Sequence, residues 1–481
     1  MSGILRSPEV ERYELSRSEL DALSGLVGAP YLLVAKDDLV AYSRDWTQDL
    51  VHVPSAVAKP RTTGEVSTLL AFCNERKIPV TPQGGRTGLS GGALPVAGGL
   101  VLSLERMNSI LEIDTANFVA VVEPGVVTQT LQEAVEEKGL FYPPDPASRG
   151  SCMIGGNIAE NAGGPHAAKY GVTGKWVLGL EAVFANGSVA ATGGKTRKDV
   201  AGYDLTSLLV GSEGTLGIVT KAWLRLIAKP TAWATVLAPF PSLESAANGV
   251  FEIHRRGLVP SACEVIDRPA VEASSKKKGV GVPFPEAEAR ILLDFDGDSQ
   301  DEVERDVTAA GEILIECGAL DVALATDEAK RRTLWDVRRG IAEAVHDLGV
   351  NVELDLAVPR SELVSLVKGV RRIAEEARLR AFVYGHAADG NLHVRLVREG
   401  KEAGDAADFG DAVTAIYSEA VRLGGTITGE HGVGLTLRDL LPMRRPPAFL
   451  AAMRAIKSAL DPNGILNPGK LVPGAGAPGR A

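Results

Sequence analysis

The sequence has few cysteines and no long apolar run, and both features limit the class of protein. Its four cysteines, Cys73, Cys152, Cys263 and Cys317, are far apart and form no CxxC pair. This spacing argues against a cysteine-rich zinc site and against a disulfide framework. The sequence contains no run of about 18 apolar residues, and its N-terminus shows no apolar run after a basic start. We therefore expect a soluble, cytoplasmic protein.

Basic patches and the common nucleotide-binding fingerprints are also missing. The net charge is −10, and no Lys/Arg run is interleaved with aromatic residues. Nucleic-acid binding is disfavoured because phosphate neutralisation needs a basic surface. The dinucleotide pattern GxGxxG does not occur in the glycine-rich blocks, and the sequence "GKT" at 194–196 lacks the earlier glycine of a P-loop, where Val189 stands.

The length of 481 residues predicts roughly three domains. We expect a helical lead-in over 1–50, a strand-rich domain with glycine loops over 51–230, a second domain over 231–430, and a helical C-terminal segment over 431–481. In the first domain a helix should begin at Thr62 or Thr63, with a strand at "IPVTP".

In the second domain, short β-branched and apolar runs alternate with helices that have polar starts. The runs "TAWATVLAPF", "SACEVID" and "ARILLDFDG" predict strands, and helices are expected from about Ser242, Asp301, Ser361 and Asp405. This alternation indicates an α+β domain with helices on one face of a largely antiparallel sheet. The predicted fold class is therefore α+β.

Glycine is concentrated in three blocks, "QGGRTGLSGGALP", "GSCMIGGNIAENAGG" and "GSEGTLGIV". Glycine lets backbone amides approach a ligand closely, so such loops suit phosphates and ring systems. Composition alone leaves two readings equally open: turns in a strand-rich domain, or a cradle for a cofactor.

The segment "YGHAADGNLHV", residues 384–394, contains two of only seven histidines. Asp389 and Gly390 predict a tight hairpin, and a two-residue loop would place His386 directly opposite His393. Opposed residues have Cβ atoms about 4.5–5.5 Å apart, close enough for both rings to bind one metal ion. For a lone histidine pair, the solvated hairpin is the favoured explanation, and a third ligand would change that balance. A longer loop would break the register.

Six motifs recur in family order: "PQGGRTGLSGGALP", "PPDPASRGSCMIGGNIAENAGGPHAAKYGVTG", "GGKTRKDVAGYDLTSLLVGSEGTLGIVT", "GHAADGNLH", "TGEHGVG" and "NPGK". Together they resemble the FAD-linked oxidases of the vanillyl-alcohol-oxidase-like fold, which have a PCMH-type FAD domain. The resemblance is strongest to the D-2-hydroxy-acid dehydrogenase branch, which includes D-lactate dehydrogenase, the glycolate oxidase flavin subunit and D-2-hydroxyglutarate dehydrogenase. It covers nearly the whole chain after residue 50.

The resemblance implies that residues 51–230 form two α/β subdomains that clasp FAD, with the C-terminal segment returning to the flavin. Some relatives attach FAD through a histidine in the first glycine loop, where this chain has Arg86 and Thr87, so non-covalent FAD is expected. The positions expected to contact FAD are Pro82, Gly84, Gly85, Arg86, Thr87, Gly88, Ser90, Gly91, Pro144, Asp145, Ser148, Ser151, Gly155, Gly156, Asn157, Asn161, Gly163, Gly217, Ile218, Val219 and Asn467.

The resemblance also implies a metal site and a mechanism. Positions matching His386, His393 and Glu430 bind a divalent metal, often zinc, in that branch, and the position of His431 acts as the base. Arg338 matches an arginine that binds the substrate carboxylate. The implied reaction oxidises a D-2-hydroxy acid to the 2-oxo acid, with hydride transfer from C2 to flavin N5.

Three departures from the family pattern concern the substrate. A lysine that helps to hold a distal carboxylate in the 2-hydroxyglutarate enzymes is replaced by Glu353, a threonine by Ala342, and an asparagine by Arg395. The first two changes favour a smaller or apolar D-2-hydroxy acid over a five-carbon diacid. Arg395 offers a replacement cation, so the choice stays open.

Three alternatives remain. The chain could be another alcohol oxidase of the same flavin fold, a flavin subunit of a multi-subunit glycolate oxidase, or a zinc hydrolase with a glycine-rich domain. No iron–sulfur cysteine pattern is present, so an external acceptor is expected. Candidates are an electron-transfer flavoprotein, a quinone, a cytochrome or an iron–sulfur subunit. The resemblance also implies a possible homodimer.

Overall fold

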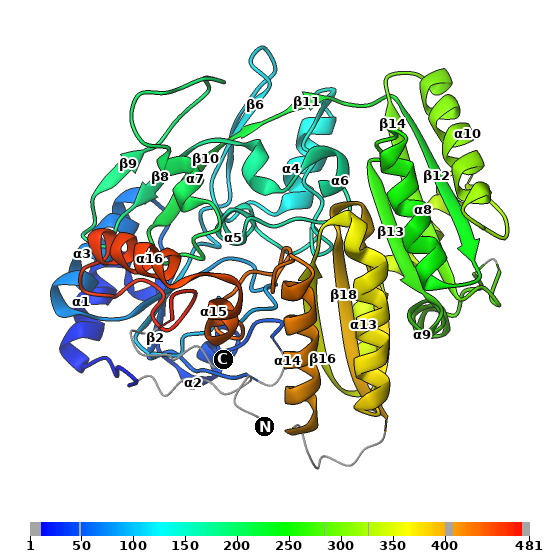
Figure 1. Ribbon diagram of the computed structural model, residues 1–481. Coiled ribbons are helices and arrows are strands. Elements are labelled where there is room, and N and C mark those ends of the chain that lie inside the picture. Colours follow the sequence, from blue (N-terminus) through cyan, green and yellow to red (C-terminus); the bar gives the residue numbers. More distant parts are fainter. Residues whose placement is uncertain (1–10, 48–49, 283, 326, 400–406, 474–481) are drawn as a thin grey trace. The chain divides into compact units, whose positions relative to one another are not determined.

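The computed structural model describes residues 11–47, 50–282, 284–325, 327–399 and 407–473. Two compact units make up the chain (Figure 1). We call residues 164–171 and 230–429 the seven-strand unit, and the remaining described residues the two-sheet unit, after its two larger sheets. The second unit is therefore built from three separate parts of the chain, the last of which begins at Glu430. A third, two-stranded sheet of β7 (Leu140–Phe141) and β11 (Ile227–Ala228) also belongs to this unit.

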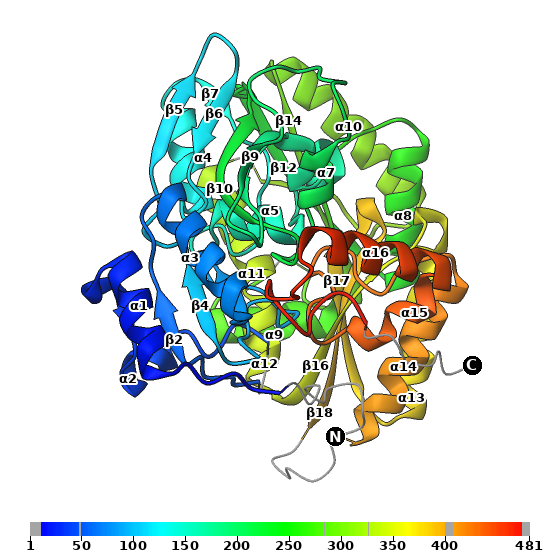
Figure 2. The ribbon, with the colours of Figure 1, turned by 90° about the vertical axis from the view of Figure 1, so that its left-hand side faces the viewer.

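The first sheet of the two-sheet unit has the strand order β1-β2-β4-β3. Its strands β2, β4 and β3 are parallel, and the short β1 is antiparallel to β2. The bounds are β1 Leu32–Leu33, β2 Ala56–Ala58, β3 Val80–Gln83 and β4 Leu100–Ser103. Helix α3 (Thr63–Arg76) begins after Thr62, whose hydroxyl accepts from the N–H of Glu65, as the sequence predicts. Helix α1 (Arg17–Val27) packs on α3 (Figure 2).

The second sheet of this unit is antiparallel throughout, in the order β5-β6-β10-β8-β9. Its central strand β10 alternates buried and half-buried residues, the pattern of a sheet with two unlike faces. The strands are β5 Ile110–Asp114, β6 Val119–Val122, β8 Val177–Val183, β9 Val189–Ala191 and β10 Ile218–Arg225. The other elements named below are α4 Thr128–Glu136, α5 Ile154–Glu160, α15 Leu441–Arg444 and α16 Pro447–Leu460.

The seven-strand unit contains one antiparallel sheet in the order β15-β12-β14-β13-β17-β18-β16. Some neighbouring strands, such as β13 and β17, come from distant parts of the sequence, whereas β13 and β14 or β17 and β18 are consecutive. The strands are β12 Ala232–Phe240, β13 Ala262–Asp267, β14 Ala289–Gly297, β15 Ala323–Ala325, β16 Gly349–Ala357, β17 Arg380–His386 and β18 Asn391–Glu399.

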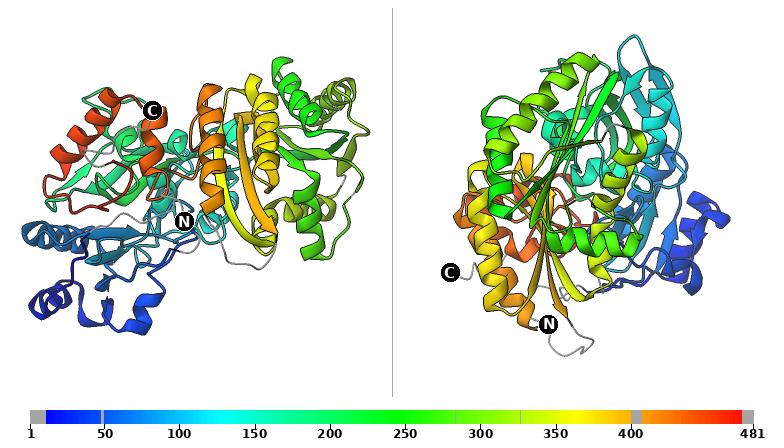
Figure 3. Two further views of the ribbon diagram at one scale, coloured as in Figure 1. Left: turned by 60° about the horizontal axis from the view of Figure 1, so that its bottom comes forward. Right: turned by 90° about the vertical axis from the view of Figure 1, so that its right-hand side faces the viewer.

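Helices cover both faces of this sheet (Figure 3), whereas the sequence predicted helices on one face only. The reason lies in the central strands: every residue of β13 and nearly every residue of β14 is buried, which a one-sided cover cannot achieve. One face carries α8 (Leu243–Arg255), α10 (Gln300–Glu316), α13 (Leu363–Glu376) and α14 (Ala407–Arg422), and the other carries α9 (Arg268–Lys278), α11 (Glu328–Arg339) and α12 (Ile341–His346).

The mixed and antiparallel sheets confirm the predicted α+β class. Helix α8 begins after Ser242 as predicted, while α10 begins at Gln300 and α13 at Leu363, and the helix start expected at residue 405 lies outside the described residues. Across the part of the chain that the structure describes, none of the helices has the length and apolar character needed to cross a membrane.

Candidate functional site

The two histidines of the segment 384–394 do not pair in the predicted register. Strands β17 and β18 place Tyr384, not His386, opposite His393. A 3₁₀ turn over Ala387–Asp389 follows β17, with Gly390 at φ 73°, so the connection is longer than the two residues expected. The Asp-Gly signal identified the hairpin, but the N–H of Gly390 bonds to the carbonyl of Ala387 and closes a different turn.

The histidine side chains nevertheless lie together. His386 is two residues beyond Tyr384 on the same face of β17, which makes it a diagonal neighbour of His393. The two ring centroids are 5.2 Å apart and the ring planes are perpendicular. Both side chains are buried. The pair therefore lies inside the seven-strand unit, which excludes the solvated hairpin and is compatible with chelation.

A carboxylate lies behind each histidine, supplied by the neighbouring strand. In the register, Glu264 of β13 is opposite His386, and Asp355 of β16 is opposite His393. The Nδ1 atom of His386 is 2.5 Å from Oε1 of Glu264, and Nδ1 of His393 is 3.8 Å from Oδ1 of Asp355. The contact at His386 orients that ring and leaves its Nε2 to bind a metal ion, whereas the 3.8 Å separation at His393 is longer than a hydrogen bond. The donor set and its support fit a divalent metal.

Glu264 also holds the arginine that the sequence singled out. Its Oε2 atom accepts a 2.6 Å hydrogen bond from Nε of Arg338, which is buried near the end of α11. Although burial alone would raise it, the pKa of Glu264 falls to about 2 because Arg338 and His386 are so close. The guanidinium also lies 5.0 Å from the ring centroid of Tyr384. One buried carboxylate thus fixes a histidine and an arginine together.

Asp355 connects the histidine pair to the third motif. Its Oδ2 accepts hydrogen bonds from the hydroxyl of Thr428 and the N–H of Gly429, both at 2.8 Å. Gly429 is the last residue of the seven-strand unit, and the chain continues directly into Glu430 and His431. The last residue of the unit, Gly429, is therefore hydrogen-bonded to Asp355, the carboxylate that lies opposite His393.

Glu430 and His431 belong to the two-sheet unit. Oε1 of Glu430 is 4.0 Å from Nε2 of His431, and a Cβ at Gly163 would lie 2.5 Å from Oε2 of Glu430. The following residues are fixed, because the N–H groups of Val433 and Gly434 donate to the carboxylate of Glu213 at 2.8 and 2.7 Å. Glu213 of the "GSEG" sequence therefore fixes the backbone two and three residues after His431, the predicted base.

An ion pair between the buried Arg395 and the partly buried Glu353 lies next to the histidines on the same sheet face. Arg395 is 4% exposed and directly opposite Glu353, to which its Nη2 donates. Its Nη1 donates to Oδ1 of Asn351 at 2.9 Å, and its Nε to the hydroxyl of Tyr384 at 3.3 Å. The cation that the sequence offered as a carboxylate partner is therefore neutralised within the protein.

The first two glycine blocks pack closely against each other. A Cβ at Gly85 would lie 2.4 Å from the carbonyl oxygen of Ser151, and one at Gly155 would lie 2.6 Å from Cβ of Pro124. In contrast, a Cβ at Gly88 or Gly156 would have no neighbour within 4 Å. The blocks are therefore tight on one side and open on the other, the arrangement that a backbone cradle requires.

Buried polar atoms without a hydrogen-bond partner gather along these blocks. Among the described residues they include Oε1 of Gln83, Oγ of Ser90, the hydroxyl of Tyr142 and Oε2 of Glu160. Other such atoms lie elsewhere in the chain, but because buried polar groups are normally satisfied, these four fit a ligand rich in donors and acceptors. FAD has such groups on its diphosphate, ribityl chain and isoalloxazine.

Several of the predicted FAD residues also have structural roles. Asn157 donates to Oγ1 of Thr128 at 2.6 Å, Asp145 pairs with Arg149 at 2.9 Å, and Asn161 accepts from the N–H of Gly174. Asn467 donates to the carbonyls of Gly92 and Glu213 at 2.9 and 2.8 Å. The C-terminal "NPGK" motif thus bridges the first and third glycine blocks.

Replacing Gly85 by alanine should lower FAD affinity by about 10–100-fold, since forced overpacking costs about 1–3 kcal/mol. The new Cβ must displace the backbone of Ser151, which separates the two blocks. The measurement is flavin absorbance per protein after dialysis. Gly25→Ala is the control, because its Cβ would be in open space. Equal FAD retention in both variants would contradict the proposed cradle.

Known structures identify the fold. The chain matches the structure of p-cresol methylhydroxylase with substrate bound at a TM-score of 0.78 and 18% identity, covering 96% of this chain and 98% of that one. It also matches 4-ethylphenol oxidase from Gulosibacter chungangensis at a TM-score of 0.75 and 20% identity, covering 96% and 98%. The fold is therefore of the PCMH type, as the sequence resemblance predicted.

Family models identify the class. Residues 54–193 match the FAD binding domain, and residues 229–471 match the C-terminal domain of FAD linked oxidases. The chain belongs to the FAD-linked oxidase family. FAD as the cofactor follows from the first of these matches.

Three curated relatives narrow the group. The chain is 43% identical to the glycolate oxidase subunit GlcD of Bacillus subtilis (90% of this chain, 92% of that protein) and 41% identical to the D-lactate dehydrogenase of Archaeoglobus fulgidus (90% and 95%). It is 35% identical to the D-2-hydroxyglutarate dehydrogenase of Stutzerimonas stutzeri (94% and 98%). The protein is an FAD-linked oxidoreductase of the group that contains these hydroxy-acid enzymes.

Proposed function

We propose that this protein oxidises a small D-2-hydroxy monocarboxylic acid, such as D-lactate or glycolate, to the 2-oxo acid. The observation that carries the choice of substrate is the ion pair of the buried Arg395 with the partly buried Glu353 beside the histidines. A diacid needs an available cation for its distal carboxylate. Since Arg395 is already neutralised by Glu353, the site favours an acid with one carboxylate.

We further propose that His386, His393 and Glu430 bind a divalent metal ion, with zinc the expected identity. Two imidazoles and one carboxylate are a usual set of protein ligands for catalytic zinc. Support comes from the 5.2 Å ring pair, from the carboxylate of Glu264 at Nδ1 of His386, and from the direct continuation of the chain from Gly429 to Glu430. When bound, such a cation lowers the pKa of a 2-hydroxyl group.

The proposed roles of the remaining residues follow from their chemistry. Arg338, whose guanidinium plane is fixed by Glu264, binds the carboxylate of the substrate. His431 takes the proton from the 2-hydroxyl group, which suits an imidazole near neutral pH. FAD, when bound, takes up the hydride from C2. We propose non-covalent FAD because neither Arg86 nor Thr87 can form the histidyl link, and a cytoplasmic location and homodimer stay predictions.

Anaerobic mixing with a panel of 2-hydroxy acids tests this function through the loss of visible flavin absorbance. D-Lactate should reduce the flavin with a kcat/KM at least about tenfold above that of D-2-hydroxyglutarate, because burying an unpaired carboxylate costs more than about 1.4 kcal/mol. L-Lactate should not reduce it. The function would be wrong if no D-2-hydroxy acid bleached the flavin.

Replacing Glu353 by glutamine tests the choice of substrate. The change leaves Arg395 uncompensated, and a distal carboxylate can then pair with it, so the kcat/KM ratio of D-2-hydroxyglutarate to D-lactate should rise about tenfold. Glu343→Gln is a matched control, because the Glu343 side chain is 65% exposed and pairs only at the surface, with Lys277. An unchanged ratio in both variants would show that Arg395 does not select the substrate.

A further inference from the structure

The surface helix α16 has an unusual distribution of charge. Nine of its fourteen residues are exposed: all five alanines, Phe449, Ile456, Pro447 and Ser458. Its two charged residues, Arg454 and Lys457, are half-buried on the opposite side. At 100° per residue, the exposed positions span an arc of about 200° without a charge. A surface helix normally carries its charged residues on the face that is exposed to water.

The inner side of α16 is fixed to the segments predicted to hold FAD. Lys457 donates to the carbonyls of Thr215 and Leu466 at 2.7 and 2.8 Å, and Leu450 is the helix's one buried residue. Thr215 belongs to the "GSEGTLGIV" block and Leu466 precedes Asn467. Because a helix with its side chains is about 10–12 Å across, the outer face of α16 is about one helix thickness from those segments.

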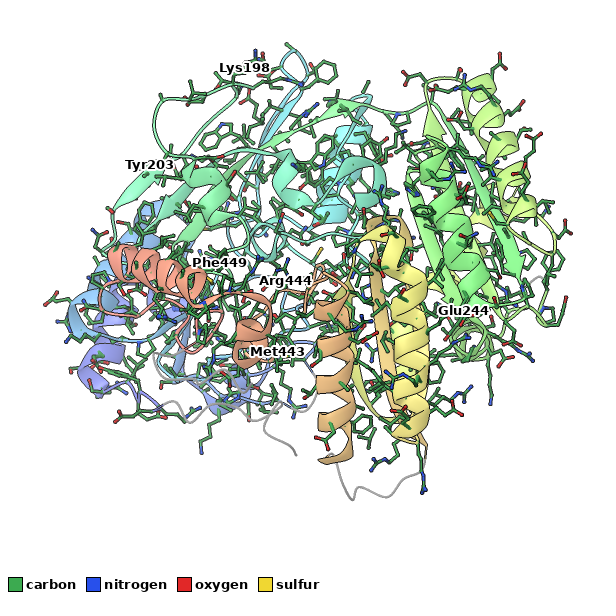
Figure 4. All side chains as sticks on the ribbon, viewed as in Figure 1. Lys198, Tyr203, Glu244, Met443, Arg444 and Phe449 are labelled. Atoms are coloured by element: carbon green, nitrogen blue, oxygen red, sulfur yellow. The ribbon has the colours of Figure 1, made fainter. Side chains whose placement is uncertain are left out.

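The edge of this apolar face is basic. Residues 440–460 contain Arg444, Arg445 and Arg454 but no acidic residue, in a chain of net charge −10. The fourth cation, Lys457, faces inward and pairs with Asp461 at 2.5 Å. Arg444 is exposed on α15, and the guanidinium of Arg445 lies 4.6 Å from the ring centroid of Phe449. Figure 4 shows Met443, Arg444 and Phe449 on α15 and α16. We call Met443, Arg444, Phe449, Ala452 and Ile456 the α16 patch.

We propose that the α16 patch is the docking surface for an acidic redox protein that accepts electrons from the flavin. The proposal rests on the proposed function, since substrate oxidation leaves two electrons on the cofactor. Charge complementarity selects an acidic partner over a second copy, because residues 440–460 of another copy bring no carboxylate to Arg444. The small alanine side chains suit close protein packing, whereas helices that insert in a lipid surface need larger apolar residues.

The test measures re-oxidation of the flavin, reduced chemically so that no substrate is required. The probes are two acidic acceptors, an electron-transfer flavoprotein and a ferredoxin, with basic cytochrome c and a small dye for comparison. Wild-type protein should reduce at least one acidic acceptor with a rate that falls as salt rises. Phe449→Asp and Arg444→Glu should raise the KM for that acceptor at least about tenfold. Reduction of the dye should not change.

Val200→Asp is the matched control, because Val200 is an apolar residue that is 96% exposed in the same unit. Three results would overturn the proposal: neither acidic acceptor is reduced by the wild type, Phe449→Asp behaves like Val200→Asp, or cytochrome c is preferred. A dimer that Phe449→Asp dissociates would assign the patch to a second copy. Binding to phosphatidylserine vesicles that is lost in Phe449→Asp would assign it to a lipid surface. If the reduced flavin passes electrons normally but no hydroxy acid reduces it, the proposed function fails and the docking surface stands.

Discussion

Replacing His431 by asparagine is expected to slow flavin reduction by D-lactate about 10²–10⁴-fold, the usual contribution of a positioned general base. Asparagine preserves the approximate size of the side chain and its hydrogen bonding but cannot accept the proton. FAD content should be unchanged, because Val433 and Gly434 stay bonded to Glu213. The measurement is the limiting rate of flavin bleaching in anaerobic stopped flow.

A second histidine provides the control for this variant. The side chain of His346 is 57% exposed at the end of α12, so His346→Asn should leave the bleaching rate unaltered. If His431→Asn reduced its flavin at the wild-type rate, His431 would not be the base. Loss of FAD in His431→Asn would instead indicate a structural role for this residue in the loop that begins at Glu430.

The sequence predicted the family and the fold class well, for identifiable reasons. Caps such as Thr62 and Ser242 mark helix starts locally, and each accepts from a backbone N–H in the first turn as expected. The motif order identified the family because glycine spacing and flanking residues are specific in combination. These features need no knowledge of distant contacts.

The details that failed depend on contacts distant in sequence. The Asp389-Gly390 signal does not distinguish a two-residue turn from the 3₁₀ turn that forms, and that choice shifted the register by two residues on β17. The cover on the second face of the sheet was also missed, since α9 and α11 are rich in charged residues and α12 has only six residues. Whether both faces of a strand are buried can be decided only when the strands and helices that pack around it are known.

The carboxylates behind the histidines had no sequence signal at all. Glu264 is 122 residues from His386 and occurs in "SACEVID", which predicts only a strand. Strand order alone brings the two together, since β13 pairs with β17. In retrospect, a glutamate between the apolar residues Cys263 and Val265 of a strand was the available clue, because a buried carboxylate needs a partner.

Replacing Glu264 by glutamine is expected to weaken metal binding about 10–100-fold, the usual effect of removing a carboxylate behind a ligating histidine. The amide keeps the shape of the side chain but cannot hold His386 and Arg338 by charge. The measurement is competition for zinc with a coloured chelator, which needs no turnover. The KM for D-lactate should rise as well, because Arg338 loses the partner that fixes its plane.

Asp294→Asn separates this effect from a general loss of stability. Asp294 is a buried carboxylate in the same sheet, on β14, and it accepts from the indole N–H of Trp335 and from Arg331. Its removal should lower the melting temperature without changing zinc affinity, since it contacts neither histidine. If Glu264→Gln bound zinc as tightly as the wild type, the carboxylate would serve packing alone. The pairing of His386 with Glu264 would then say nothing about a metal ion.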